Sequence, residues 1–523
     1  MTSVCKPLIH LCNIFAIALI FSSIQPANSA KVVIIPFSYY THTFSFIQIT
    51  HQLLKQGHDV TFVISSAVKF QHGELNTVDS TQFHFHSFKS QLIEDDFNRC
   101  RLAVKGNSYV APCLDEAYKE ADAILSDEKA RHLVQESDLL ICEFSFFGCN
   151  LLSRVSNASR QIDINLAGFL DPGPTAYYKV PNPIAYVPQH GADIGTTNMT
   201  ILQRLQNFWV YWAAKVYFMI DTIPRTYRIT RKHFQNGFPD LSPKASLYLL
   251  ATDFSIDYAR PYTPFVKLIG PVFVTSLNAG TVKEKETPII QDTDLGFILV
   301  SFDFDGYLQE IIDRNTLRDI INTFSKLPYK FIWHYNGPSL SLVPTNVYIT
   351  SQLPWNLVSH SKIKAFITNC KIIDVHQASY HGVPIIGLPI TNENFYLAHR
   401  MEHVNKGKFT PMQFVNGTWL YYAIQQVIED EYIIDNSRQI ASILHHRPNN
   451  LSSVEEVGYW VDYVLNHGTK HLKPEEFNMF WIIAGSYDMY IIVLGILYMI
   501  WRIVKSLLFS CCTAVFGKKI KTD

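Results

Sequence analysis

The hydrophobic positions predict an alternation of short buried strands and helices that begins just after residue 30. Residues 31–36 are apolar and rich in β-branched side chains, which is typical of a strand buried on both faces of a parallel sheet. A helical pattern follows over about 44–55, Gly57 ends it, and residues 60–64 form a second apolar run. This order predicts a βαβ unit.

The same alternation continues and predicts two α/β domains. A charged helical stretch at 114–135 precedes an apolar strand at 139–142. A second block contains a helix at 308–325 and four predicted strands, at 296–302, 330–333, 365–368 and 384–389. Residues 276–293 between the blocks are polar and rich in turn formers, as a linker is. Two doubly wound domains joined in this way face a cleft at the carboxyl ends of their strands.

The first 30 residues predict a cleaved signal peptide. Lys6 precedes an apolar run at 8–21, and small residues follow it up to Ala30. The alternative is a first transmembrane helix, which the short run with its polar interruptions disfavours.

A second apolar run, at 489–501, predicts a transmembrane helix over 486–505. Basic residues follow this run and acidic residues precede it, so we expect the tail at 506–523 in the cytosol and the body in the lumen. A buried helix of the body is the alternative. Lys519 and Lys521 resemble a dilysine retrieval signal, which implies a single-pass type I protein of the endoplasmic reticulum membrane.

Sequons and cysteines fit a lumenal body. Four N-glycosylation sequons begin at Asn157, Asn198, Asn416 and Asn450. Five cysteines lie between the two ends: Cys100, Cys113, Cys142, Cys149 and Cys370. An odd number argues against a fully paired disulfide framework, and the pairing is left open. The spacing of these cysteines shows no metal-binding pattern, so we predict no metal site.

Composition excludes several classes of protein. Lys and Arg number 44 against 45 Asp and Glu, so the chain lacks the basic surface that a nucleic-acid-binding protein needs. With 48% apolar and 13% aromatic residues, it is not disordered. The sequence contains no H-E-x-x-H, G-x-S-x-G, CxxC, P-loop or dinucleotide fingerprint, which removes the support for the common hydrolase, redox and kinase-like functions.

The most specific motif lies in the second block, where residues 365–368 (AFIT) are followed by 377–389 (QASYHGVPIIGLP). Segments 56–61, 259–261 and 460–464 support it. With these motifs the chain resembles the UDP-glucuronosyltransferase family, the membrane-bound UDP-glycosyltransferases of animals. The resemblance implies a GT-B fold, in which residues 31–275 bind a small lipophilic acceptor and residues 294–485 bind the UDP-sugar.

The resemblance also implies an inverting displacement, in which a histidine base removes the acceptor proton and a carboxylate orients that histidine. His42 stands at the position of the base, in the loop after the first strand. Glu143 stands where the family has an aspartate. Glutamate keeps the charge but adds a methylene.

The donor-binding motif departs from the family at most positions. Ser301 is retained, and Ser351 replaces the aromatic residue that stacks on uracil, with Trp355 close by. The remaining replacements are Asn369 for the histidine on the diphosphate, Cys370 and Lys371 for two glycines, Ile373 and Asp374 for an Asn-Gly pair, Gln377 for the carboxylate on the ribose, and Asn392 with Glu393 for the Asp-Gln pair that reads the sugar. Side chains in place of glycines are expected to crowd the phosphate cradle.

Two functions follow from the resemblance. The first is transfer of glucuronic acid or another hexose from a UDP-sugar, with no cofactor besides this co-substrate. The alternative is a catalytically impaired member that acts as a binding or regulatory partner of active transferases. Assembly with itself or with family members is left open, and contact with membrane lipid is expected. Residues 208–220 are strongly apolar, and we expect a core helix there rather than a membrane-facing one.

Overall fold

The computed structural model describes residues 29–37, 40–66, 83–90, 114–144, 148–157, 160–234, 244–273, 293–302, 311–337, 340, 343–351 and 357–516. The predicted signal peptide up to residue 28, the linker up to residue 292, and Cys100, Cys113, Trp355, Lys519 and Lys521 lie outside these residues. The chain forms two compact units, Met1–Lys470 and His471–Asp523.

The first sheet contains seven parallel strands in the order β3-β2-β1-β4-β5-β6-β7. Their bounds are β1 (Lys31–Ile35), β2 (Asp59–Ser65), β3 (Phe83–Phe88), β4 (Leu139–Glu143), β5 (Gln161–Asn165), β6 (Leu247–Leu250) and β7 (Val266–Leu268). The order reverses between β1 and β4, which is the switch point of a doubly wound sheet, where ligands bind.

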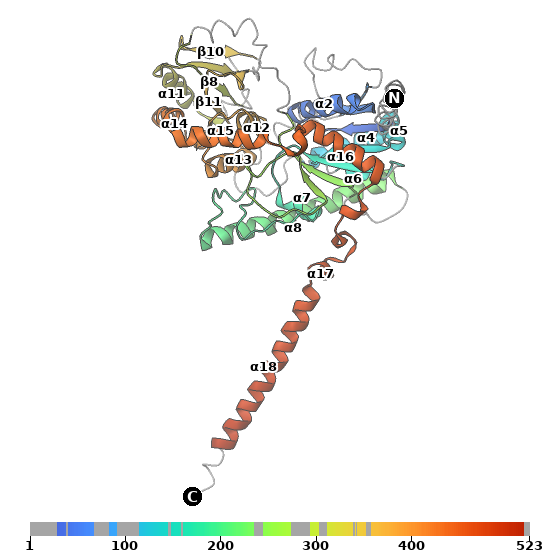
Figure 1. Cartoon of the computed structure of the whole chain (residues 1–523). Coiled ribbons are helices and arrows are strands. Elements are labelled where there is room, and N and C mark those ends of the chain that lie inside the picture. Colours follow the sequence, from blue (N-terminus) through green and yellow to red (C-terminus); the bar gives the residue numbers. More distant parts are fainter. Residues whose placement is uncertain are drawn as a thin grey trace, which may run out of the picture. The chain divides into compact units, whose positions relative to one another are not determined.

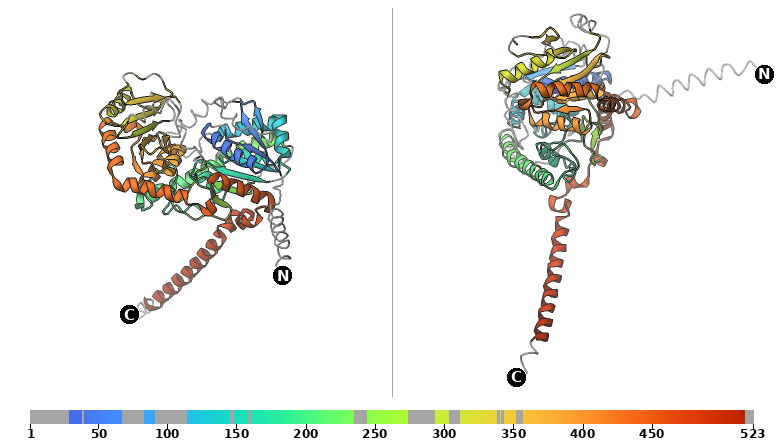
Figure 2. Two further views of the ribbon diagram at one scale, coloured as in Figure 1. Left: turned by 45° about the horizontal axis from the view of Figure 1, so that its top comes forward. Right: turned by 90° about the vertical axis from the view of Figure 1, so that its left-hand side faces the viewer.

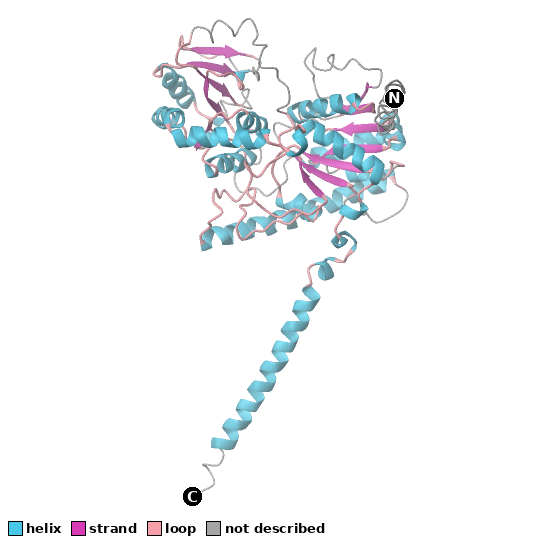
Figure 3. Cartoon of the chain, in the orientation of Figure 1, coloured by secondary structure: helices cyan, strands magenta, loops and turns pink. Residues whose placement is uncertain are grey.

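Helices cover this sheet (Figures 1 and 3). They are α2 (Tyr40–Lys55), α4 (Leu114–Ser126), α5 (Glu128–Glu136), α6 (Cys149–Leu152), α7 (Pro172–Tyr177) and α8 (Ile201–His233). The single helix predicted at 114–135 is divided at Asp127, because its side chain accepts a hydrogen bond from Ala130 N (2.8 Å) and so caps a new helix.

The second sheet contains six parallel strands in the order β10-β9-β8-β11-β12-β13. Their bounds are β8 (Phe297–Ser301), β9 (Lys330–His334), β10 (Val347–Thr350), β11 (Ile363–Thr368), β12 (Ile385–Gly387) and β13 (Gly407–Phe409). Its helices are α11 (Arg314–Ser325), α12 (Ile372–Tyr380), α13 (Asn392–His403), α14 (Gly417–Glu429), α15 (Glu431–His445) and α16 (Ser453–His467).

After the second sheet the chain returns to the first domain, since α16 packs against α2 (Figure 1). Asp462 of α16 accepts a hydrogen bond from Gln56 Nε2 (2.9 Å) and lies 3.1 Å from His58 Nε2. The motifs at 56–61 and 460–464, far apart in the sequence, therefore form one contact.

The second unit holds the predicted membrane span. Its helices are η6 (Glu475–Asn478), α17 (Trp481–Ala484) and α18 (Tyr487–Phe516). Within the described residues, Tyr487–Ser510 is the one stretch long and apolar enough to cross a bilayer, and none of its most apolar window is buried. Twenty-four residues rise about 36 Å, which exceeds the hydrocarbon core of about 30 Å. Its complete exposure favours a membrane span over the buried helix considered as the alternative.

The prediction that residues 208–220 form a core helix is wrong for one face of α8, because that face is exposed. Val210, Ala214 and Phe218 are buried, but Trp209 is 62% exposed and Ile220 is 66% exposed. Both faces are apolar, so composition alone did not distinguish the inner face from the outer one.

Candidate functional site

Two predicted catalytic residues come to the carboxyl edge of neighbouring strands. Glu143 is the last residue of β4 and is buried. Strand β1 pairs with β4, placing Ile35 opposite Cys142. His42 is the third residue of α2, the helix that follows β1, so it lies in a helical turn and not in the predicted loop. Both residues therefore belong to the switch point of the first sheet.

A disulfide joins Cys142 to Cys149, a pairing that the sequence left open. It links the end of β4 to the first residue of α6 and closes the segment that begins with Glu143. The two sulfurs and an Asp163 oxygen lie within 4.8 Å of one another, but the disulfide engages both sulfurs. The disulfide therefore restrains the backbone beside Glu143.

Phenol side chains surround a second buried carboxylate next to this edge. Asp163 accepts hydrogen bonds from Gln161 Nε2 (2.6 Å) and from the Tyr178 hydroxyl. The Tyr178 ring stacks on Tyr248, with 5.1 Å between centroids, and Phe144 contacts both rings. Burial raises the pKa of Tyr248 well above its ordinary value, so this hydroxyl stays protonated. Sequence reasoning missed this group, although Asp163 is the one charged residue of β5, whose sequence is QIDIN.

The segment that should cradle phosphate lies between β11 and α12. Asn369, Cys370 and Lys371 form this connection, and all three are buried. Cys370 has a φ of 62°, the left-handed conformation that glycine adopts without penalty, which is the residue the family has there. Its thiol is fully buried, and this burial raises its pKa.

Asp374 places a negative charge at the start of α12. Its Oδ2 accepts a hydrogen bond from Thr368 Oγ1 (2.5 Å), and its Oδ1 lies 3.8 Å from Lys371 Nζ. A helix N-terminus attracts anions, so this carboxylate occupies the electrostatic position of a phosphate. In the sequence, Asp374 stands out only as the replacement of a family glycine, although an acid in an apolar first turn is a usable signal.

Gln377 lies one turn further along α12 and is fully buried. Neither its Nε2 nor its Oε1 has a hydrogen-bond partner among the described residues. Unsatisfied buried polar atoms each cost about 1–3 kcal/mol. A ligand hydroxyl would satisfy them.

The other predicted donor residues are spread along the second sheet. Ser301 ends β8, opposite Thr368 in the register with β11, and its Oγ lies 3.3 Å from His334 Nδ1. Ser351 follows β10 at the edge of the sheet, with β9 between that strand and β8. The structure thus brings Ser301 to the phosphate segment and leaves Ser351 apart from it.

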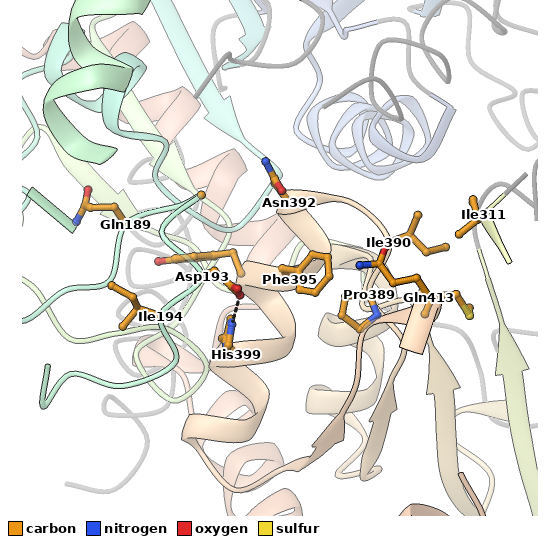
Figure 4. A pocket seen from close by; sticks show the side chains of 13 residues that line it. Gln189, Asp193, Ile194, Ile311, Pro389, Ile390, Asn392, Phe395, His399 and Gln413 are labelled. Carbon is orange, nitrogen blue, oxygen red and sulfur yellow. Dashed lines mark hydrogen bonds and ion pairs between the residues drawn. The ribbon is translucent and has the colours of Figure 1, made fainter. Parts of the chain in front are cut away.

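A cavity of about 270 Å³ lies between the two sheets' domains (Figure 4). Gln189 and Asp193 line it from the segment before α8, and Asn392 and His399 line it from α13. His399 Nε2 lies 2.8 Å from Asp193 Oδ1, and this hydrogen bond lowers the pKa of Asp193. Of the two predicted sugar-reading residues, Asn392 faces this cavity, and Glu393 is its neighbour in the first turn of α13.

The comparisons with known proteins agree with this geometry. The family model described as "UDP-glucoronosyl and UDP-glucosyl transferase" matches residues 30–522. The chain belongs to this UDP-glycosyltransferase family. The predicted family is therefore confirmed.

Relatives of this chain match nearly its whole length. Human 2-hydroxyacylsphingosine 1-beta-galactosyltransferase is 24% identical and covers 94% of this chain and 92% of its own. Human UDP-glucuronosyltransferase 1A1 is also 24% identical and also covers 94% of this chain and 92% of its own. The solved UDP-glucosyltransferase of Polygonum tinctorium has a TM-score of 0.57 at 13% identity, over 84% of this chain and 99% of its own. The predicted GT-B fold is confirmed.

Two buried guanidinium groups among the described residues connect the two domains. Arg260 of the first domain donates to the Tyr396 hydroxyl of α13 (3.1 Å). Arg400 of α13 donates to Ile256 O (2.6 Å), Gly168 O (2.7 Å) and Thr252 Oγ1 (3.2 Å), all in the first domain. Its Nε also lies 3.4 Å from Asp257 Oδ1. Sequence reasoning missed this role of Arg400, because most of the acceptors of its guanidinium are backbone carbonyls.

Arg400→Met should destabilise the protein by about 3 kcal/mol or more, since Asp257 and two carbonyls would stay buried without this donor. Thermal unfolding of the detergent-solubilised full chain measures the change. Arg438→Met is the matched control, because that side chain is 72% exposed. Equal midpoints for both variants would contradict the role assigned to Arg400.

The four sequon asparagines, Asn157, Asn198, Asn416 and Asn450, are all exposed. Asn416 also caps α14 by accepting a hydrogen bond from Trp419 N (2.9 Å) through its side-chain oxygen. A glycan attached to the side-chain nitrogen would leave this oxygen in place. Glycosylation stays a prediction at all four positions.

Proposed function

We propose that this protein transfers glucuronic acid or another hexose from a UDP-sugar to a small lipophilic acceptor, with inversion at the anomeric carbon. The observation that carries the proposal is the switch point of the first sheet, where Glu143 ends β4 and His42 lies in the helix after β1. The galactosyltransferase relative, whose name specifies a 2-hydroxyacylsphingosine, supports a lipophilic acceptor.

In the proposed reaction the acceptor hydroxyl oxygen attacks the anomeric carbon and forms the new glycosidic bond. His42 takes the hydroxyl proton, and the bond between sugar and diphosphate breaks with its electron pair leaving on UDP. The charge of Glu143 stabilises the imidazolium that forms, as the orienting carboxylate of a triad does. No cofactor is needed besides the UDP-sugar co-substrate.

A second candidate function is that of a catalytically impaired partner of active transferases. The observation that favours it is the Thr368–Asp374–Lys371 network, which places the chain's own charges at the start of α12. A diphosphate would have to compete with the Asp374 carboxylate there.

A transfer assay on full-length protein in microsomes tests the proposal. Labelled UDP-glucuronic acid, UDP-glucose and UDP-galactose are each supplied with hydroxylated lipophilic acceptors, and the anomeric configuration of any product is determined by NMR. We expect an inverted product with at least one donor, against none in microsomes without the protein. Absence of transfer from all three, together with co-purification of an active transferase, would favour the partner function.

We also propose a type I orientation in the endoplasmic reticulum membrane, supported by the charges around the apolar segment Tyr487–Ser510. Protease added to intact microsomes should remove only the tail beyond about residue 510. Lys519→Ser with Lys521→Ser should allow complex glycans to be acquired, as endoglycosidase H resistance reports. Digestion of the body, or glycans unchanged by the double substitution, would refute the orientation or the retrieval signal respectively.

A further inference from the structure

Helix α8 carries apolar side chains on two opposite faces. The inner face is buried and includes Val210, Ala214, Phe218 and Ile229. The outer face consists of exposed apolar residues at helical spacing. We call these residues the outer stripe: Ile201, Leu202, Leu205, Phe208, Trp209, Trp212, Val216, Met219, Ile220, Ile223 and Tyr227. The helix runs along the outside of the body (Figures 1 and 2).

The outer stripe is too long to be an ordinary exposed patch. Residues 201–227 span about 40 Å of helix, and monomeric soluble domains rarely expose a continuous apolar surface of that extent. Exposed tryptophans such as Trp209, at 62%, prefer a site with an apolar and a polar side. This surface therefore needs an apolar environment of its own.

The charges of α8 indicate which apolar environment the outer stripe contacts. The helix contains six Lys and Arg residues and a single acid, Asp221. Arg225 pairs with Asp115 and Asp221, and Lys232 pairs with Asp122. The other four basic residues are Arg204, Lys215, Arg228 and Arg231. Lys215 Nζ lies 5.0 Å from the centroid of the Trp212 ring, with its aliphatic stem beside the outer stripe. An apolar stripe with basic residues around it is the composition of a helix that lies in the interface of a bilayer with anionic lipid.

The length of the connection to the membrane span favours the same environment. The first unit ends at Lys470 and the apolar segment begins at Tyr487, which leaves 16 residues between them. Even fully extended, those residues reach only about 55 Å. The body is thus held close to one leaflet, where the effective lipid concentration is high and a modest second contact is sufficient.

We propose that the outer stripe of α8 lies in the headgroup and upper acyl region of the leaflet that faces the body, with the helix axis in the membrane plane. The helix does not cross the bilayer, because its inner face is packed on the body. This contact does not depend on whether the protein turns over a UDP-sugar.

The contact has a consequence for the cavity. Asn207, on the inner face of α8, accepts a hydrogen bond from Gln189 N (2.7 Å) and donates to Val187 O (2.8 Å). Gln206 Nε2 donates to Ala192 O (2.7 Å). The segment held in this way contributes Gln189 and Asp193 to the cavity lining. Lipid contact by α8 would therefore hold one wall of the cavity near the surface in which lipophilic molecules dissolve.

Photocrosslinking tests the contact in the full-length protein. The chain is reconstituted in vesicles of phosphatidylcholine with phosphatidylserine at about 7:3, a share of which carries a diazirine on the acyl chain. After irradiation, adducts are mapped by peptide mass spectrometry. We expect adducts in the span and on outer-stripe residues such as Trp209 and Met219, and none on the inner residues Val210 and Ala214. Adducts confined to the span would overturn the proposal.

A pair of matched variants gives the second measurement. Trp209→Glu with Ile220→Glu should lower the yield of α8 adducts about tenfold or more, because each substitution places a charge in the apolar stripe. Tyr422→Glu with Tyr432→Glu is the control, because these side chains on α14 and α15 are 65% and 63% exposed. Equal yields in both double variants would refute the contact, as would crosslinks from α8 to a second polypeptide in place of lipid. The mapping on the unmodified chain needs neither variant to fold.

Discussion

UDP is expected to bind the unmodified protein about a thousandfold more weakly than a variant in which the phosphate cradle is restored. The restoring changes are Asn369→His, Cys370→Gly, Lys371→Gly, Asp374→Gly and Gln377→Glu together. Two of these changes have a reason in the structure. The carboxylate of Asp374 competes with phosphate at the start of α12, and Cys370 holds a conformation that glycine adopts freely. The glutamate restores a charge-assisted bond to ribose.

Isothermal titration of the detergent-solubilised full chain with UDP measures this difference. The changes are made together because the cradle acts as a unit and neighbouring substitutions do not add. Lys371→Gly alone is the control, and we expect it to leave UDP affinity low, because it removes the cation that faces Asp374. Tight binding by the unmodified protein would show that the cradle already accepts a diphosphate. Failure of both proteins to bind would favour the partner function.

His42→Ala is expected to reduce turnover about a hundredfold or more, which is the loss that follows removal of a general base. Glu143→Gln should reduce turnover too, because a neutral amide cannot stabilise the imidazolium. Steady-state rates of sugar transfer measure both effects.

Glu136→Gln provides the matched control for this series. Glu136 ends α5 and its side chain is 52% exposed, so the same chemical change there should leave the rates unchanged. Circular dichroism establishes that each variant is folded. An active His42→Ala protein would contradict the proposed mechanism. It would not contradict membership of the family, which rests on the sequence match.

The sequence by itself determined the elements that depend on local pattern. The β-branched runs at β1 and β2 and the stop at Gly57 fixed the opening βαβ unit, because strands buried on both faces are recognisable from a few residues. The apolar segment in α18 was determined by length and composition. The family motifs predicted the roles of His42 and Glu143; Glu143 ends β4, and His42 lies in α2, the helix that follows the neighbouring strand β1.

Only the tertiary structure decided which side chains meet. The bond between Thr368 and Asp374, the pairing of Cys142 with Cys149 and the contacts of Arg400 join residues that no local pattern relates. The same holds for α8, which is apolar on both sides, so that periodicity could not tell its inner face from its outer one. Its orientation was decided by the body it packs against, because Val210, Ala214 and Phe218 fit that surface and the outer stripe is left exposed.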